Sequence, residues 1–286
     1  MKTVRIIPRL DIKGPNLVKG IHLEGLRAFG DPAIFAKYYY EDGADEILLM
    51  DVVASLYDRN SLHDLIKHIS KDIFIPLTVG GGLRTVEDIK NVLRVGADKV
   101  ILNTAAIKNP NLIKEAVNKF GSSTICIAIE AIKQPDDTYM AFTDNGREYT
   151  GLDVIKWANQ IQKLGVGEIV LTSVDNEGTG QGFDLNFINQ IADLSTVPII
   201  VHGGAGNKEN ILKVLKNSKC DAVCAASIFH YETINKINPE NLINTQNKIE
   251  GNFDFIKSGN TFKKIQATNI PDLKKFLRKN NIPVRY

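Results

Sequence analysis

The sequence contains little cysteine, methionine or tryptophan, with three, three and one of these residues among 286. The cysteines, Cys126, Cys220 and Cys224, are odd in number and show no Cys-x-x-Cys spacing. Such a set argues against disulfide bonds and against a zinc site. Nothing else in the sequence indicates a metal or an organic cofactor, so we expect neither, and we expect a reduced protein of the cytoplasm.

Long apolar runs and an excess of one charge are also missing. No run reaches the ~18 apolar residues that a membrane-spanning helix needs, and the N-terminus begins with a strand pattern rather than a signal peptide. The formal net charge of +2, with 24% charged residues, gives no indication of a nucleic acid or a membrane as partner. With 43% hydrophobic residues the chain can bury a large core, in one large α/β domain or two smaller ones.

Short apolar runs of strand type alternate with helical patterns along the chain, which is typical of a parallel sheet with crossover helices. The expected strands are 4–10, 46–52, 75–79, 99–102, 124–129, 168–173, 197–201 and 221–225. The expected helices are 32–41, 61–69, 86–95, 110–120, 152–164, 185–192, 209–215 and 271–279. A further segment, 134–149, contains Asp144-Asn145-Gly146 and is expected to form a hairpin.

The chain repeats itself at a distance of about 120 residues, which indicates two equivalent halves. The segment from Val79 to Leu93 aligns without gaps with the segment from Val201 to Leu215. Four strand–helix units followed by four more predict a (β/α)8 TIM barrel, whose usual length is ~250 residues. An open, doubly wound sheet is the alternative, but it explains neither the number of strands nor the repeat. We expect a single barrel over 1–286, with an insertion at about 231–266 before the last helix.

Two acidic residues end equivalent strands of the two halves. Asp11 ends the first strand and Glu130 ends the fifth. The active site of such a barrel lies at the C-terminal ends of its strands, so both carboxylates are expected at one mouth. Two carboxylates across a pocket are typical of paired acid and base catalysis. The alternative is that both are structural acids in salt bridges.

Glycines and small polar residues follow other strands at the same end. Backbone without a Cβ can approach an anion closely, so these turns predict two equivalent phosphate sites. Ordinary structural turns are the alternative. The first site comprises Gly81, Gly82, Asn103 and Thr104, and the second comprises Gly203, Gly204, Ala226 and Ser227. Further candidates for substrate binding are Thr172, Glu177, Gly178 and His202.

Charged residues complete the candidate set. Lys19 lies in a glycine-bounded loop at 14–20 that could fold over the mouth, although an ordinary exposed lysine is the alternative. Four charged residues lie at the opposite, N-terminal ends of strands, where they could form a stabilising ring or line an entrance. These are Arg5, Glu46, Lys99 and Glu168.

With these residues in view, the chain resembles the cyclase subunit of imidazole glycerol phosphate synthase, over nearly its whole length except roughly 231–266. The sister isomerase of histidine synthesis has the same half-repeated barrel, but the Lys19 motif and the four charges fit the cyclase better. The motifs that carry the resemblance are Val18-Lys19-Gly20, Phe29-Gly30-Asp31-Pro32, Gly43-Ala44-Asp45-Glu46, Val79-Gly80-Gly81-Gly82, Gly96-Ala97-Asp98-Lys99, Asn103-Thr104-Ala105-Ala106, Leu171-Thr172-Ser173, Gly203-Gly204-Ala205-Gly206 and Ala225-Ala226-Ser227-Ile228-Phe229-His230.

The resemblance implies a partner and a reaction. A glutaminase subunit would dock on the N-terminal face of the barrel, and its ammonia would pass the four charged residues as a gate and travel through the barrel. At the mouth, ammonia would attack an aminoimidazole nucleotide with two phosphates, giving imidazole glycerol phosphate and an aminoimidazole carboxamide ribonucleotide. Asp11 and Glu130 would act as general acid and base, with Lys19 on a mobile loop.

The sequence departs from the family pattern only at the catalytic end. Glu130 replaces an aspartate, Arg9 and His202 replace small residues, and Asn176-Glu177 replaces Arg-Asp. Three functions therefore stay open: a cyclase of histidine biosynthesis, a paralogue that supplies ammonia for amidination of a surface-polysaccharide sugar, and a non-catalytic activator of the glutaminase. Neighbouring genes would separate the first from the second.

Overall fold

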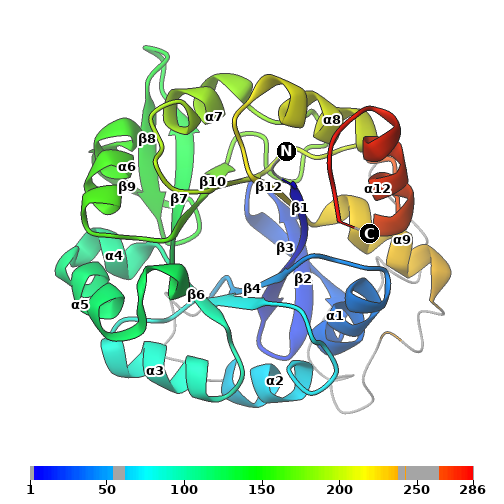
Figure 1. The fold of residues 1–286 in the computed structure, drawn as a ribbon, viewed down its shortest axis with the longest axis horizontal. Coiled ribbons are helices and arrows are strands. Elements are labelled where there is room, and N and C mark those ends of the chain that lie inside the picture. Colours follow the sequence, from blue (N-terminus) through cyan, green and yellow to red (C-terminus); the bar gives the residue numbers. More distant parts are fainter. Residues whose placement is uncertain (1–2, 54–61, 238–241, 243–263, 286) are drawn as a thin grey trace.

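Eight parallel strands form a closed barrel. In chain order they are β1 (Arg5–Lys13), β4 (Ile47–Asp51), β5 (Leu77–Gly80), β6 (Lys99–Leu102), β7 (Ile125–Lys133), β10 (Glu168–Ser173), β11 (Ile199–His202) and β12 (Ala222–Ala225). The computed structural model describes residues 3–53, 62–237, 242 and 264–285 of the chain. Strand β1 pairs with β12 and β4, and β10 pairs with β7, so the sheet closes on itself. The predicted (β/α)8 barrel is confirmed (Figure 1).

Helices connect the strands and surround the barrel. They are α1 (Pro32–Glu41), α2 (Leu62–Ile69), α3 (Val86–Arg94), α4 (Thr104–Lys108), α5 (Asn111–Phe120), α6 (Val154–Lys163), α7 (Leu185–Ala192), α8 (Lys208–Asn217), α9 (Ser227–Lys236) and α12 (Ile270–Lys279), with a short 3-10 helix at Ser122–Thr124. Side chains cap several of them: the Asp31 carboxylate accepts from the N–H of Ala33, and the Asp184 carboxylate accepts from that of Phe187. Such caps satisfy N–H groups that lack a partner within the helix.

Each half of the barrel carries one hairpin after its first strand. Strands β2 (Asn16–Ile21) and β3 (Glu24–Gly30) follow β1, and strands β8 (Tyr139–Thr143) and β9 (Glu148–Asp153) follow β7. Both pairs are antiparallel. The hairpin predicted at 134–149 is therefore confirmed, whereas the loop predicted at 14–20 is wrong, because most of it forms β2. The apolar run here, Leu17-Val18, holds only two residues and is too short to indicate a strand.

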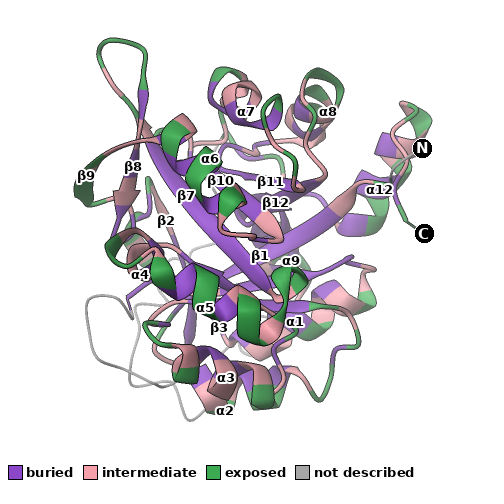
Figure 2. Ribbon diagram, turned by 60° about the vertical axis from the view of Figure 1, so that its left-hand side comes forward, coloured by how far each residue is buried: buried purple, intermediate pink, exposed green. Residues whose placement is uncertain are grey.

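The core has two parts, separated by the barrel wall. Successive side chains of a strand point to opposite faces, so Ile6 of β1 packs outward against the helices while Ile7 packs inside the barrel. Both parts are buried, and Figure 2 shows the barrel strands β1 and β7 buried along most of their lengths. The apolar layer inside the barrel comprises Ile7, Leu48, Ile101, Cys126, Ala128, Val170, Ile200, Ala222 and Cys224.

The predicted insertion at about 231–266 needs correction at its beginning. Residues 231–236 belong to α9, a helix whose buried polar residues His230 and Thr233 interrupt the apolar periodicity. Residues 238–241 and 243–263 lie outside the described part of the chain. The last helix, α12, is held to the barrel by Lys274, whose ammonium lies 2.8 Å from the Asp45 carboxylate. Within the described residues, no helix combines the length and apolar character needed to cross a membrane.

Candidate active site

The two predicted acids face the mouth from opposite sides of the barrel. Strands β1 and β7 are separated by three strands in either direction around the sheet, and Asp11 and Glu130 end their barrel-lining portions. Both residues are buried. The Asp11 carboxylate accepts a hydrogen bond of 2.7 Å from Arg9 Nε, and the Glu130 carboxylate accepts one of 3.0 Å from the N–H of Gly146. The structure therefore places Asp11 and Glu130 on opposite sides of the barrel, as the half-repeat predicted.

The surroundings of Glu130 and Lys19 shift the pKa values of these two groups. Burial raises the pKa of Glu130 to about 7, against the opposing effect of the Arg9 cation. Burial also lowers the pKa of Lys19 to about 8, although Asp11 opposes the change. A carboxyl group and an amine that titrate near neutral pH can exchange protons with a substrate under ordinary conditions. Both residues are therefore suited to acid and base chemistry.

Lys19 is held at the mouth by the loop after β10. Its ammonium forms an ion pair with the Glu177 carboxylate, and both side chains are buried. Glu177 also accepts a hydrogen bond of 3.0 Å from the N–H of Leu23, in the turn between β2 and β3. Gly178 packs directly against the backbone of β2, since a Cβ at Gly178 would be 2.5 Å from the Gly20 carbonyl oxygen. The alternative of an ordinary exposed lysine is therefore wrong, and the hairpin lies over the mouth.

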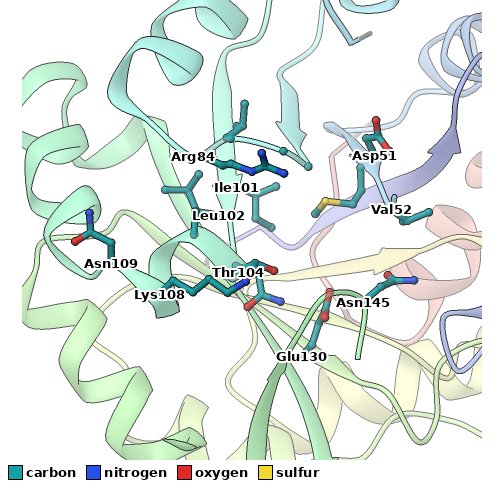
Figure 3. A pocket seen from close by; sticks show the side chains of 16 residues that line it. Asp51, Val52, Arg84, Ile101, Leu102, Thr104, Lys108, Asn109, Glu130 and Asn145 are labelled. Atoms are coloured by element: carbon teal, nitrogen blue, oxygen red, sulfur yellow. The ribbon is translucent and has the colours of Figure 1, made fainter. Parts of the chain in front are cut away.

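The first predicted phosphate site lines a large cavity. The cavity measures about 340 Å³ and includes Gly81, Gly82, Asn103 and Thr104, with Glu130 at its edge (Figure 3). Gly81 has a φ of +101°, and a Cβ there would be 2.3 Å from the Asp51 carbonyl oxygen. Only glycine fits this turn, which exposes backbone to the cavity. Arg84, Lys108 and Asn145 also line the cavity, although no sequence motif indicated them.

The second predicted phosphate site is much smaller. Its residues line a cavity of about 10 Å³, at the same end of the barrel. Three side chains, those of Lys19, Glu177 and His202, occupy the space that the first site leaves open. The two sites are therefore equivalent in the chain but not in shape. The predicted residues around this cavity are Glu177, Gly178, His202, Gly203, Gly204, Ala226 and Ser227.

Thr172, the remaining predicted binding residue, contacts His202 instead of either cavity. The Thr172 hydroxyl lies 3.2 Å from His202 Nδ1, and Arg9 Nη1 lies 3.3 Å from the same atom. A guanidinium can only donate, so Nδ1 accepts and the imidazole is neutral. Burial, together with the Arg9 and Lys19 cations, lowers the pKa of His202 well below its usual range. His202 therefore stays neutral throughout the range in which Glu130 titrates.

The four charged residues at the other end form a closed ring. Arg5 lies 2.8 Å from Glu46 and 2.6 Å from Glu168, and Lys99 lies 2.8 Å from each of the same two carboxylates. The Thr78 hydroxyl donates a further hydrogen bond of 2.6 Å to Glu46. Each of the two cations therefore contacts both carboxylates, and the opposite charges neutralise one another at the axis of the barrel. Among the residues that the structure describes, no group of three His, Cys, Asp or Glu residues is placed to hold a metal ion.

Comparison with known proteins places this arrangement in a family. A model of the family described as "Histidine biosynthesis protein" matches residues 5–235. The imidazole glycerol phosphate synthase subunit HisF of Legionella pneumophila is 52% identical over 209 residues, which cover 73% of this chain and 99% of the relative. The chain belongs to the HisF family. The HisF of Clostridium beijerinckii is 47% identical over 232 residues (81% and 92%), and that of Hydrogenobaculum sp. is 42% identical over 285 residues (100% of both chains).

Membership of the HisF family decides among the three functions that the sequence left open. The chain is a cyclase of the imidazole glycerol phosphate synthase type, a lyase of histidine biosynthesis. The sugar-amidinating paralogue and the non-catalytic activator are not favoured, since relatives that carry the HisF name match at 42–52% identity. The departures at Arg9, Glu130 and His202 therefore occur in a chain that belongs to the HisF family.

Proposed function

We propose that the chain uses ammonia from a glutaminase subunit to convert a bis-phosphorylated aminoimidazole nucleotide into imidazole glycerol phosphate and an aminoimidazole carboxamide ribonucleotide. The observation that carries the proposal is the pair of buried acids, Asp11 and Glu130, on opposite sides of one mouth. Glu130 lines the first of two glycine-lined sites at this end of the barrel, and two such sites suit a substrate with a phosphate at each end. We place this reaction in the cytoplasm.

The two acids divide the proton transfers between them. The nitrogen of ammonia loses protons as it forms bonds to carbon, and the leaving ribonucleotide gains one. Asp11, whose carboxylate pairs with Arg9, is the candidate for the general base. Glu130, whose pKa is raised to about 7 by burial, is the candidate for the member that exchanges its proton. Pairs of carboxyl groups with such unlike surroundings commonly take opposite roles.

The N-terminal face offers a surface for the glutaminase. Phe74 and Leu194 are 80% and 55% exposed, and both lie in loops that lead into barrel strands, β5 and β11. Large apolar side chains that remain exposed often mark protein interfaces. The ring of Arg5, Glu46, Lys99 and Glu168 lies at the same end of the barrel. We infer that the partner docks here and delivers ammonia to the ring, away from water.

The ring supplies a test of ammonia entry. Replacing Lys99 by methionine leaves two carboxylates with one cation, so the ring rearranges and glutamine-dependent turnover falls by about tenfold or more. Turnover with external ammonium changes much less, because that ammonia can reach the mouth directly. The measurement is the ratio of the two rates, with the glutaminase present in both assays.

A matched control is available on α3. Lys90 forms a surface ion pair with Glu87, and exposed ion pairs contribute little to stability. Lys90→Met therefore leaves the ratio of the glutamine-dependent to the ammonium-dependent rate at the wild-type value. An equal loss with both nitrogen sources in Lys99→Met would contradict entry through the ring.

A further inference from the structure

Arg9 crosses the inside of the barrel at its catalytic end. It extends from β1, and its guanidinium reaches Asp11 on its own strand and His202 on β11, at 2.7 and 3.3 Å. Strand β12 lies between β1 and β11 in the sheet, so the side chain spans the inner face of β12. Arg9 is only 2% exposed and is among the largest fully buried side chains of the described chain.

The space beneath Arg9 is apolar. Inside the barrel, Ile7 on β1 and Cys224 on β12 belong to the apolar layer described above. Beneath that layer lies the charged ring that contains Arg5. From the N-terminal face upward, the axis therefore carries a charged ring, an apolar layer and then one buried guanidinium. A small molecule that follows this axis meets Arg9 last, directly before Asp11.

The chemistry of Arg9 distinguishes ammonia from ammonium. Although burial opposes it, the Asp11 carboxylate raises the pKa of Arg9, so the group is a permanent cation that repels ammonium. Within the described part of the chain, Arg9 Nη2 is buried and has no hydrogen-bond partner. An unpaired buried donor costs free energy, and the lone pair of neutral ammonia can accept from it, whereas ammonium has no lone pair.

We propose that Arg9 closes the catalytic end of the barrel and lets neutral ammonia out when substrate takes the Asp11 carboxylate from it. This inference rests on the proposed function, since it assumes that ammonia travels inside the barrel. A substrate group that binds Asp11 competes with the guanidinium for the same oxygens. The Arg9–Asp11 pair thereby couples the opening of the barrel to the occupancy of the site, and it keeps solvent ammonium out.

An isotope competition measures this closure directly. The complex with its glutaminase turns over unlabelled glutamine and the bis-phosphorylated nucleotide, in a bath of ¹⁵N-ammonium, and the label in the product is counted. Wild-type product carries nitrogen mainly from glutamine. Arg9→Ala opens the end of the barrel, so ammonia released from glutamine exchanges with the bath before substrate binds, and the labelled fraction rises about fivefold or more. Arg9→Lys, which keeps a cation with a shorter reach, gives a smaller rise.

Controls separate closure from positioning. If Arg9 only orients Asp11, turnover falls in Arg9→Ala but the labelled fraction stays at the wild-type value, and the proposal is overturned. Thr172→Val removes the second contact of His202 without touching the Arg9–Asp11 pair, so its labelled fraction stays low.

Should Arg9→Ala fail to fold, Arg9→Met preserves side-chain volume and is expected to show a rise in labelled fraction that exceeds that of Arg9→Lys. Absence of product from the wild-type chain with ammonium alone would instead refute the proposed function.

Discussion

Replacement of Asp11 by asparagine lowers the rate of imidazole glycerol phosphate formation by about 10³-fold, the scale of a lost proton-transfer group. Asparagine has nearly the same shape but can neither accept nor release the proton. The loss is the same with glutamine and with ammonium as nitrogen source, because Asp11 acts after ammonia has arrived. The measurement is the initial rate at saturating substrate, with product identified by mass.

The same substitution also removes the partner of a buried cation. Arg9 and Asp11 are 2% and 3% exposed in their side chains, and removal of one member of such a pair costs about 3 kcal/mol of unfolding free energy. A urea titration of Asp11→Asn therefore shows lower stability with a folded baseline retained. Asp136→Asn, the same change in the exposed turn between β7 and β8, is the control and alters neither rate nor stability. A rate for Asp11→Asn within tenfold of wild type would remove Asp11 from the chemistry.

Glu130→Gln is the second change with a large expected effect. The amide preserves the size of the side chain and an acceptor for the Gly146 N–H, but it cannot transfer a proton, so the rate falls by about 10²-fold or more. In wild type, a limb of the pH–rate profile lies near pH 7, the pKa to which burial raises Glu130. The limb is absent from the residual activity of Glu130→Gln. A limb that persists there belongs to another group.

The stability of the fold tests the same pKa independently. Because the pKa of Glu130 is raised in the folded state, from 4.5 to about 7, its neutral form is favoured by folding. That contribution is complete below pH 4.5 and is lost as the pH rises through 7, where the fold must hold a buried carboxylate. Glu130→Gln is therefore more stable than wild type at pH 9, by about 3 kcal/mol or less, and matches it at about pH 4. Equal stability at pH 9 would show that the carboxylate is well solvated.

The barrel was predictable because its signals are repeated along the chain. Apolar runs of strand length recur eight times, and the segments that begin at Val79 and Val201 align without gaps. A repeated supersecondary unit has few ways to bury its apolar faces, so the repeat and the strand count together select a closed barrel. The position of Asp11 opposite Glu130 follows from the same symmetry, since equivalent strands of two halves lie across the barrel from each other.

What the sequence did not predict depends on contacts between distant segments. Lys19 lies on a strand because Asn16–Ile21 pairs with β1 and β3, and its burial depends on Glu177, more than 150 residues away. The inequality of the two phosphate sites arises from the size of His202 and from the Lys19–Glu177 pair. The path of the Arg9 side chain across the barrel to His202 could not be read from spacing, since that contact joins the first strand to the seventh.

The most direct test of the account is a turnover measurement on the purified chain, without a glutaminase. The bis-phosphorylated aminoimidazole nucleotide is supplied with excess ammonium salt at alkaline pH, where free ammonia can reach the mouth from solution. We expect imidazole glycerol phosphate and the aminoimidazole carboxamide ribonucleotide in equal amounts, with both lost in Asp11→Asn. A folded chain that leaves intact substrate unconverted would contradict it.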